Sequence, residues 1–274
     1  MFREPFIVLF FFLMVQMSST SQECPNLQEN YPGHEYIAQN EYLKASNFFD
    51  SLANSEESEV RAIGLYNSSL IKFRNARYVG ALKQIETAVE LYPNCAKFVY
   101  QRAKYTATVG SFLESITFYN KALELGYDSA SIFKERAEAK LGLEDHKGAL
   151  GDADMLVKKT NQVEDYLLKA KIYIEKKDIS KAKEVIDEVI EKDISIAEAH
   201  FLNAICQLKN KELDNSIESY KRAAVLDSEY SDSRIISGIE AYLAKDVERA
   251  CKYWQNTNKI SKPLADTYIE LYCL

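Results

Sequence analysis

The chain contains few of the residues that build tight turns. Its 274 residues include only nine Gly and five Pro, and sandwiches or barrels of short strands usually need more of both. Histidine is also scarce: His34, His146 and His200 stand far apart, without the His, Cys and acidic clustering that zinc or another metal requires. The composition therefore favours helix, and we predict no metal site.

The motifs that carry catalysis or nucleotide binding are missing as well. The sequence has no Gly-rich phosphate loop, no G-x-S-x-G elbow and no H-E-x-x-H helix. We therefore predict a protein that is not an enzyme and uses no cofactor. The formal net charge is −7, so the chain lacks the positive field that binding to a phosphate backbone requires. Nucleic acid is not an expected partner.

One long apolar run is present, close to the N-terminus. Arg3 precedes the run from Phe6 to Val15, and small polar residues follow up to Ser21, which is the order of a secretory signal peptide. The run is shorter than the roughly 20 apolar residues that cross a bilayer. We expect residues 1–21 to be a signal peptide, with no membrane span after its removal. The mature protein would be periplasmic, associated with the cell envelope or secreted, and Glu23 before Cys24 disfavours a lipid anchor.

Small residues recur through the rest of the chain with a period of about 34 residues and a single one-residue deletion. The first register is Ser69, Ala103, Ala137, Ala170, Ala204 and Gly238. The second is Ala81, Ser115, Ala149, Ala182, Ser216 and Ala250. Four residues after each member of the second register stand Ile85, Tyr119, Ala153, Ile186, Tyr220 and Trp254. Each unit reads as two amphipathic helices, and small residues at their crossings let the helices approach closely.

The unit with the best-defined motif contains Leu65 in a position that is usually Trp, Ser68-Ser69 in place of Leu-Gly, Ala81 to Ile85 as an A-x3-F step, and Pro93 as the terminal Pro. On these residues the chain resembles the tetratricopeptide family, with about six repeats across residues 60–263. The resemblance implies an all-α fold, a right-handed α-solenoid of stacked antiparallel helix pairs. A degenerate helix pair is expected in residues 22–59 and a capping helix in residues 264–274. Sel1-type repeats remain a minor alternative, and the acidic charge argues against RNA-binding pentatricopeptide repeats.

The resemblance also implies a function, because tetratricopeptide proteins bind proteins or peptides along the concave face formed by their first helices. Carrying the groove positions onto this sequence gives Tyr66, Phe73, Tyr100, Lys104, Lys134, Lys171, Phe201 and Tyr242. We expect an exported scaffold or adaptor that holds a protein or peptide segment by aromatic anchors, with an acidic element meeting the three lysines.

Other interpretations of these features stay open. Aromatic residues at helical spacing also serve as packing, and the chain could instead be a structural subunit of a larger envelope assembly. A lumenal co-chaperone is a weaker alternative, because Glu138 stands where a clamp for a C-terminal carboxylate would have Asn, and no His-Pro-Asp motif occurs.

Five cysteines leave at least one unpaired. Antiparallel packing of the last repeat's second helix against the capping helix would bring Cys251 and Cys273 within reach of a disulfide. The residues around both also resemble the ending of exported tetratricopeptide proteins of Bacteroidetes-type bacteria. We predict this disulfide, with two buried thiols as the alternative. Pairing of Cys24 with Cys95 is left open, and Cys206 falls in a helix core position.

Overall fold

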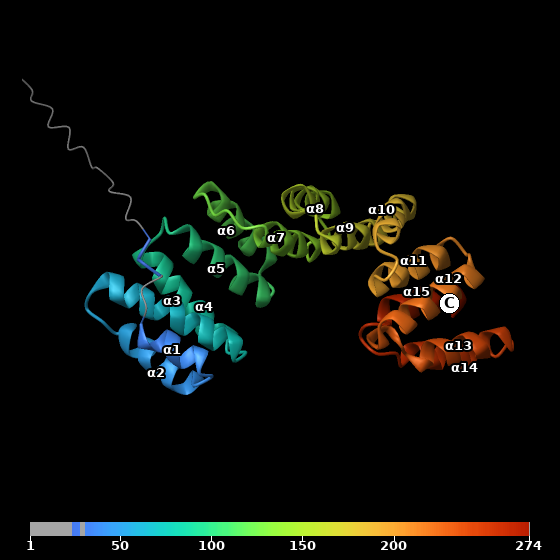
Figure 1. Ribbon diagram of the computed structural model, residues 1–274, viewed down its shortest axis with the longest axis horizontal. Helices are drawn as coiled ribbons and strands as arrows, with labels where there is room; N and C mark the ends of the chain where they lie inside the picture. The colour runs from blue at the N-terminus through green and yellow to red at the C-terminus, as the bar shows by residue number, and fades with distance from the viewer. Residues whose placement is uncertain (1–23, 28–30, 274) are drawn as a thin grey trace, which may run out of the picture. The chain divides into compact units, whose positions relative to one another are not determined.

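A computed structural model describes residues 24–27 and 31–273, so the predicted signal peptide lies outside the described residues. The described part is built of helices and contains no strand (Figure 1). This confirms the predicted all-α class. The described residues form two compact units, one that ends at Arg102 and one that begins at Ala103.

The first unit is a series of helices, of which the first four pack in order, each against the next in sequence. Its helices are α1 (Pro32–Ala38), α2 (Tyr42–Leu52), α3 (Ser58–Arg74), α4 (Tyr78–Leu91) and the start of α5 (Ala96–Thr108). α1 and α2 lie in the segment where we predict a degenerate helix pair. The pair α3 and α4 is joined by a short turn and contains both the Leu65 position and the Ala81 to Ile85 step of the sequence motif.

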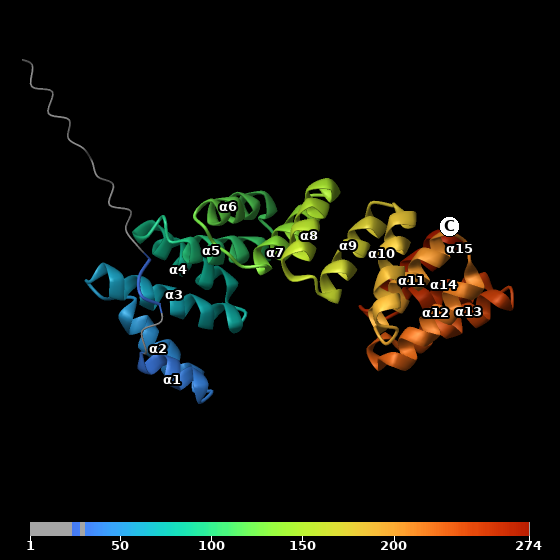
Figure 2. The same ribbon diagram turned by 45° about the horizontal axis from the view of Figure 1, so that its top comes forward.

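The second unit continues the same pattern of paired neighbours (Figures 1 and 2). Its helices are α6 (Phe112–Glu124), α7 (Ser131–Leu141), α8 (His146–Thr160), α9 (Val163–Glu175), α10 (Ile179–Lys192), α11 (Ala197–Lys209), α12 (Leu213–Leu226), the short 3-10 helix η1 (Ser228–Tyr230), α13 (Ser233–Leu243), α14 (Val247–Gln255) and α15 (Lys262–Tyr272). The pairs α7 with α8, α9 with α10, α11 with α12, and α13 with α14 are the predicted antiparallel repeats.

Both registers of small residues are buried at the contacts between helices. The Ala and Ser members of both registers are fully buried, and Gly238 is buried as well. The larger residues four positions after the second register are also buried, including Tyr119, Tyr220 and Trp254. A residue no larger than alanine at the crossing keeps the paired backbones close, and the larger residue one turn on fills the space beside it.

The turn inside each helix pair repeats too. Shortly before each second helix begins, one residue adopts a left-handed conformation with positive φ: Asn40, Ala76, Gly110, Glu144, Lys177, Lys211 and Lys245. This conformation costs residues other than glycine about 1–2 kcal/mol, yet only one of these seven residues, Gly110, is a glycine. The repeat therefore keeps the shape of the turn without keeping the residue type that most easily adopts it.

The last helix, α15, contacts two helices that are not adjacent to each other in the sequence. α15 packs against α14 and also turns back onto α11, the first helix of an earlier pair. Tyr268 stacks on Trp254 with ring centroids 4.7 Å apart, and Tyr272 lies 4.5 Å from Tyr242. Tyr268 is fully buried, so this aromatic contact is part of the core of the unit.

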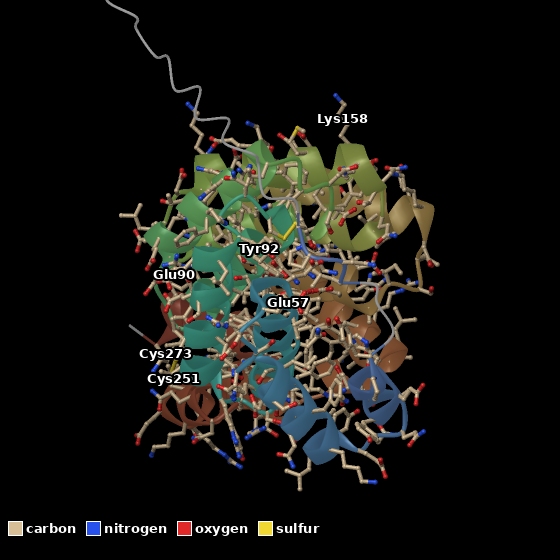
Figure 3. The ribbon with its side chains drawn as sticks, turned by 90° about the vertical axis from the view of Figure 1, so that its left-hand side faces the viewer. Glu57, Glu90, Tyr92, Lys158, Cys251 and Cys273 are labelled. Carbon is tan, nitrogen blue, oxygen red and sulfur yellow. A yellow bond between two sulfur atoms is a disulfide. The ribbon has the colours of Figure 1, made fainter. Side chains whose placement is uncertain are left out.

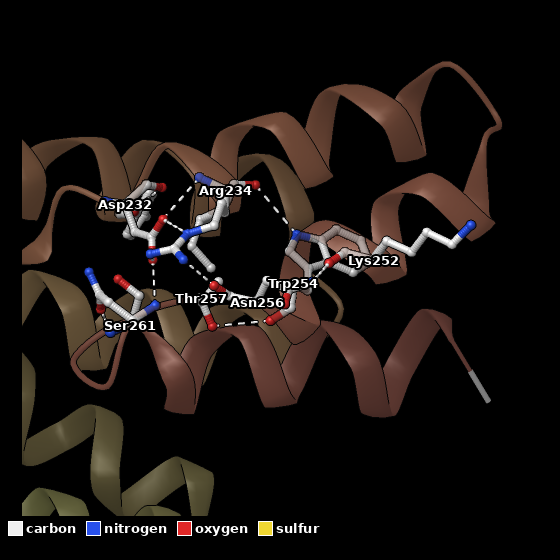
Figure 4. A network of polar contacts seen from close by, with 10 residues as sticks. Asp232, Arg234, Lys252, Trp254, Asn256, Thr257 and Ser261 are labelled. Carbon is white, nitrogen blue, oxygen red and sulfur yellow. Dashed lines mark hydrogen bonds and ion pairs between the residues drawn. The ribbon is translucent and has the colours of Figure 1, made fainter.

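A polar network fixes the connection that leads into α15 (Figure 4). The carboxylate of Asp232 accepts hydrogen bonds from Arg234 Nε at 2.8 Å and from the backbone N–H of Asn258 at 2.7 Å. Burial alone would raise the pKa of Asp232, but the hydrogen bonds from Arg234 and Asn258 outweigh it and hold that pKa below its ordinary value. The start of α13 is thereby tied to the segment just before α15.

Each unit contains one disulfide between distant parts of its sequence. Cys251 and Cys273 are bonded across α14 and the end of α15, with Cα atoms 5.9 Å apart (Figure 3). Cys24 is bonded to Cys95, with Cα atoms 4.8 Å apart, a pairing that the sequence left open. Cys206 is a buried free thiol, and burial raises its pKa to about 12.

Glycine substitutions test the close helix contacts. A Cβ added at Gly238 would lie 2.2 Å from Trp254 Nε1, whereas one added at Gly151 in α8 meets nothing within 4 Å. We expect Gly238→Ala to lower the free energy of unfolding by about 1–3 kcal/mol through overpacking. Gly151→Ala should raise it by about 0.5–1 kcal/mol, because alanine favours helix. Denaturant unfolding followed by circular dichroism measures both, and equal effects would contradict the packing at Gly238.

Alkylation tests the disulfides. In denatured but unreduced protein, we expect iodoacetamide to label Cys206 alone, and peptide mass spectrometry to find the linked pairs Cys24–Cys95 and Cys251–Cys273. Without denaturant Cys206 should resist labelling, because it is buried and its pKa is raised. Replacing Cys251 and Cys273 by Ser should lower stability by about 3 kcal/mol, since the bond closes a loop of 22 residues. Labelling of either residue before reduction would show that their bond does not form.

Candidate functional site

A cleft of about 370 Å³ lies in the second unit, on the face formed by α9 and α11. Its residues are Lys171, Ile174 and Glu175 of α9, Glu198, Phe201, Leu202 and Ile205 of α11, Tyr230 of η1, and Ile260 and Pro263 before and within the start of α15. Two predicted groove residues, Lys171 and Phe201, therefore meet at one site. Its volume is at the lower end of the range of about 300–1,000 Å³ typical of ligand pockets.

The floor of this cleft is apolar. Phe201, Leu202 and Ile205 are almost completely buried, with 3–4% of their surface exposed. Phe201 packs against Tyr230 with ring centroids 5.1 Å apart, so η1 forms one wall of the cleft. These residues fall on one face of α11 because they recur at positions i, i+1 and i+4 of the helix. An apolar side chain of a partner would be shielded from water here.

The rim of the cleft is charged. The ammonium group of Lys171 forms an ion pair with Glu198, which joins α9 to α11 across the opening. Glu175 stands on the same rim and is exposed. The pKa of Tyr230 is raised to about 12, mainly by burial and next by the nearby carboxylates of Glu198, Asp227 and Glu229. Tyr230 is therefore neutral at physiological pH, and its surroundings are acidic.

A second cleft, of about 580 Å³, brings together the predicted residues Lys104 and Lys134. It lies between the end of α5, α6 and α7, and Phe112 and Tyr119 contribute its aromatic surface. Lys104 pairs with Glu135 at 3.0 Å, whereas Lys134 is exposed. This cleft is more polar than the one between α9 and α11.

The other four predicted groove residues are packed within their own units. Tyr66 is 6% exposed and stacks on Phe98 at 5.3 Å, and Tyr100 is 7% exposed. Phe73 packs edge-on against Tyr78 at 5.2 Å. Tyr242 is covered by Tyr272 of α15. These four side chains contribute to packing, and the structure does not bring them into either cleft.

Sequence reasoning missed several residues of the cleft between α9 and α11, among them Glu175, Glu198 and Leu202 on the two helices and three residues outside them. The three residues stand outside both small-residue registers: Tyr230 in η1, Ile260 just before α15 and Pro263 in its first turn. No periodic pattern marks such residues, because their positions depend on where η1 and the last connection fold. The return of α15 onto α11 is what carries Pro263 to the cleft.

The described residues hold no group of three or more His, Cys, Asp or Glu side chains placed to bind a metal ion. Among the same residues, no helix combines the length and apolar character needed to traverse a membrane.

The sequence matches the tetratricopeptide repeat family over residues 167–231, which include α9, α10, α11 and α12 from Leu167 onward. It is also 26% identical over 129 residues to the mitochondrial import receptor subunit TOM70 of Saccharomyces cerevisiae, covering 45% of this chain and 21% of that protein. The chain thus spans about a fifth of the length of the curated relatives it matches.

Solved structures share the fold. A tetratricopeptide repeat protein from Parabacteroides merdae has a TM-score of 0.68 at 13% identity, with 88% of this chain and 96% of that chain covered. The C-terminal part of a repeat protein from Cytophaga hutchinsonii gives 0.61 at 16% identity, with coverage of 86% and 97%. YrrB, described as a tetratricopeptide repeat protein with an unusual peptide-binding site, gives 0.54 at 18% identity and covers 66% and 92%. The match at residues 167–231 and the succession of paired helices identify repeats of the tetratricopeptide type in this chain.

Proposed function

We propose that this protein is a non-enzymatic adaptor that binds a segment of another protein, or a peptide, in the cleft between α9 and α11. The repeat scaffold is suited to binding proteins, and repeat proteins of this kind are generally not enzymes. The observation that carries the proposal is an open cleft with a charged rim and an apolar floor. The floor is made by Phe201, Leu202 and Ile205.

Two comparisons support this choice of function. YrrB is described as having a peptide-binding site, and TOM70 is a receptor subunit for mitochondrial import. Neither description fixes the partner of this chain. The cleft between α9 and α11 is favoured over the second cleft because an apolar floor supplies more binding free energy than a polar one.

A pair of polar substitutions tests the site. Ile174 is half-buried in the cleft, whereas Val225 is 86% exposed elsewhere in the same unit. We expect Ile174→Gln to weaken partner binding about tenfold or more, because its amide would be buried against an apolar ligand. Val225→Gln should bind as the unchanged protein does. Quantitative mass spectrometry after affinity capture from the native cells measures this, with circular dichroism to verify folding. Equal recovery of every partner by both variants would place the site elsewhere.

We also propose that the protein is exported. The order of Arg3, the apolar run from Phe6 to Val15 and the polar residues up to Ser21 supports this, and disulfides are typical of oxidising compartments.

Mass spectrometry of the protein from fractionated native cells tests the export. We expect a chain that begins at Gln22, found in the periplasm, the envelope or the medium. Leu9→Arg should leave the full-length chain inside the cell, because a charge interrupts the apolar run. An uncleaved natural chain in the cytosol would contradict export.

A further inference from the structure

The open cleft between α9 and α11 has more acidic than basic groups at its rim. Lys171 is the basic residue that lines it, and Glu175 and Glu198 are the acidic ones. Lys171 forms an ion pair with Glu198, so the charge of this lysine is already balanced. Glu175 is exposed and takes part in no ion pair within the described residues. Among the charged residues that line this cleft, Glu175 is therefore the one without an ion pair, and it stands beside an apolar floor.

The wall of the cleft adds to this negative field. Tyr230 packs on Phe201, and the carboxylates of Asp227 and Glu229 lie close enough to help raise the pKa of this tyrosine, after the larger effect of burial. A carboxylate brought by a partner would meet like charges on two sides of the cleft. A cation would be attracted, and most strongly at low ionic strength.

The lysines do not provide the binding site for an acidic partner segment that the sequence suggested. Lys104 is paired with Glu135 and Lys171 with Glu198, so two of the three predicted lysines already have an acidic partner within the unit. Lys134 is exposed, but it lies in the second cleft beside Glu138.

We propose that the cleft between α9 and α11 selects a peptide segment in which a bulky apolar side chain is followed or preceded by Lys or Arg. The apolar side chain lies on Phe201 and Ile205, and the cationic group meets Glu175 at the rim. This inference rests on the proposed function, because it names the chemistry of the segment that the same cleft binds.

A display library tests the chemistry even while the natural partner is unidentified. Randomised dodecapeptides on phage are selected against the full folded protein, and in parallel against Ile174→Gln, Glu175→Lys and Glu191→Lys. Glu191 is exposed on α10 outside the cleft, so its reversal changes the net charge equally and serves as the matched control. Clones retained by the unchanged protein and by Glu191→Lys, but lost with Ile174→Gln, are those that depend on the cleft.

We expect the cleft-dependent clones to carry a large apolar residue next to Lys or Arg, and Glu175→Lys to lose them. A synthetic peptide of the leading clone should bind Glu175→Gln up to about fivefold more weakly than the unchanged protein, as fluorescence anisotropy measures. Raising the salt concentration should reduce this difference, because the interaction is exposed to solvent.

The outcomes separate the two proposals. If no clone depends on Ile174, the cleft is not the binding site, and both the proposed site and its chemistry are wrong. If cleft-dependent clones appear without Lys or Arg, or with Asp or Glu enriched, the site stands and the inferred basic segment is overturned. Loss of the same clones with Glu191→Lys would also overturn it, since the preference would then follow net charge alone.

Discussion

The close crossing of paired helices is the constraint on which the rest of the structure depends. At each crossing one helix presents Ala, Ser or Gly, all of them buried, and the partner helix approaches over that small side chain. At Gly238 even a methyl group has no room, because the indole of Trp254 occupies the space. Such a contact fixes the spacing of one pair, and repetition of the pair sets the first helices side by side. The face that carries the clefts is a consequence of this packing.

α15 decides how much of that face remains open in the second unit. By turning back onto α11 it buries its own Tyr268 and covers Tyr242, which a stack that ended at α14 would expose. The same return carries Pro263 to the edge of the cleft between α9 and α11, where it forms a wall. The disulfide from Cys251 to Cys273 holds the far end of the helix. One C-terminal element thus closes the core and bounds the candidate site.

The sequence predicted the repeating part of this molecule because a repeat leaves a periodic trace. Small residues occur in both registers of every repeat, and a larger residue follows four positions later in every repeat except the one with Ala153; their burial follows directly from helical geometry. The site was harder to predict, because Ile174 and Phe201 line the cleft, whereas neighbouring aromatic rings cover Tyr242 and Tyr66, which stand at the equivalent positions of other repeats. Equivalent positions differ in whether they line a cleft because each has different neighbours, which a period cannot encode. Tyr230 and Pro263 leave no periodic trace at all.

The charge of the cleft was also hard to predict from the sequence. Counting lysines along the first helices suggested a surface for an acidic partner, yet each lysine acts only with the carboxylates that the fold brings beside it. Lys171 and Glu198 stand 27 positions apart in the sequence and form an ion pair across α9 and α11. Once that pair is made, Glu175 is the exposed charged residue of the cleft that has no ion-pair partner. The basic segment that we propose for the cleft therefore depends on tertiary pairing, and it is opposite in charge to the partner that the lysines along the helices suggest.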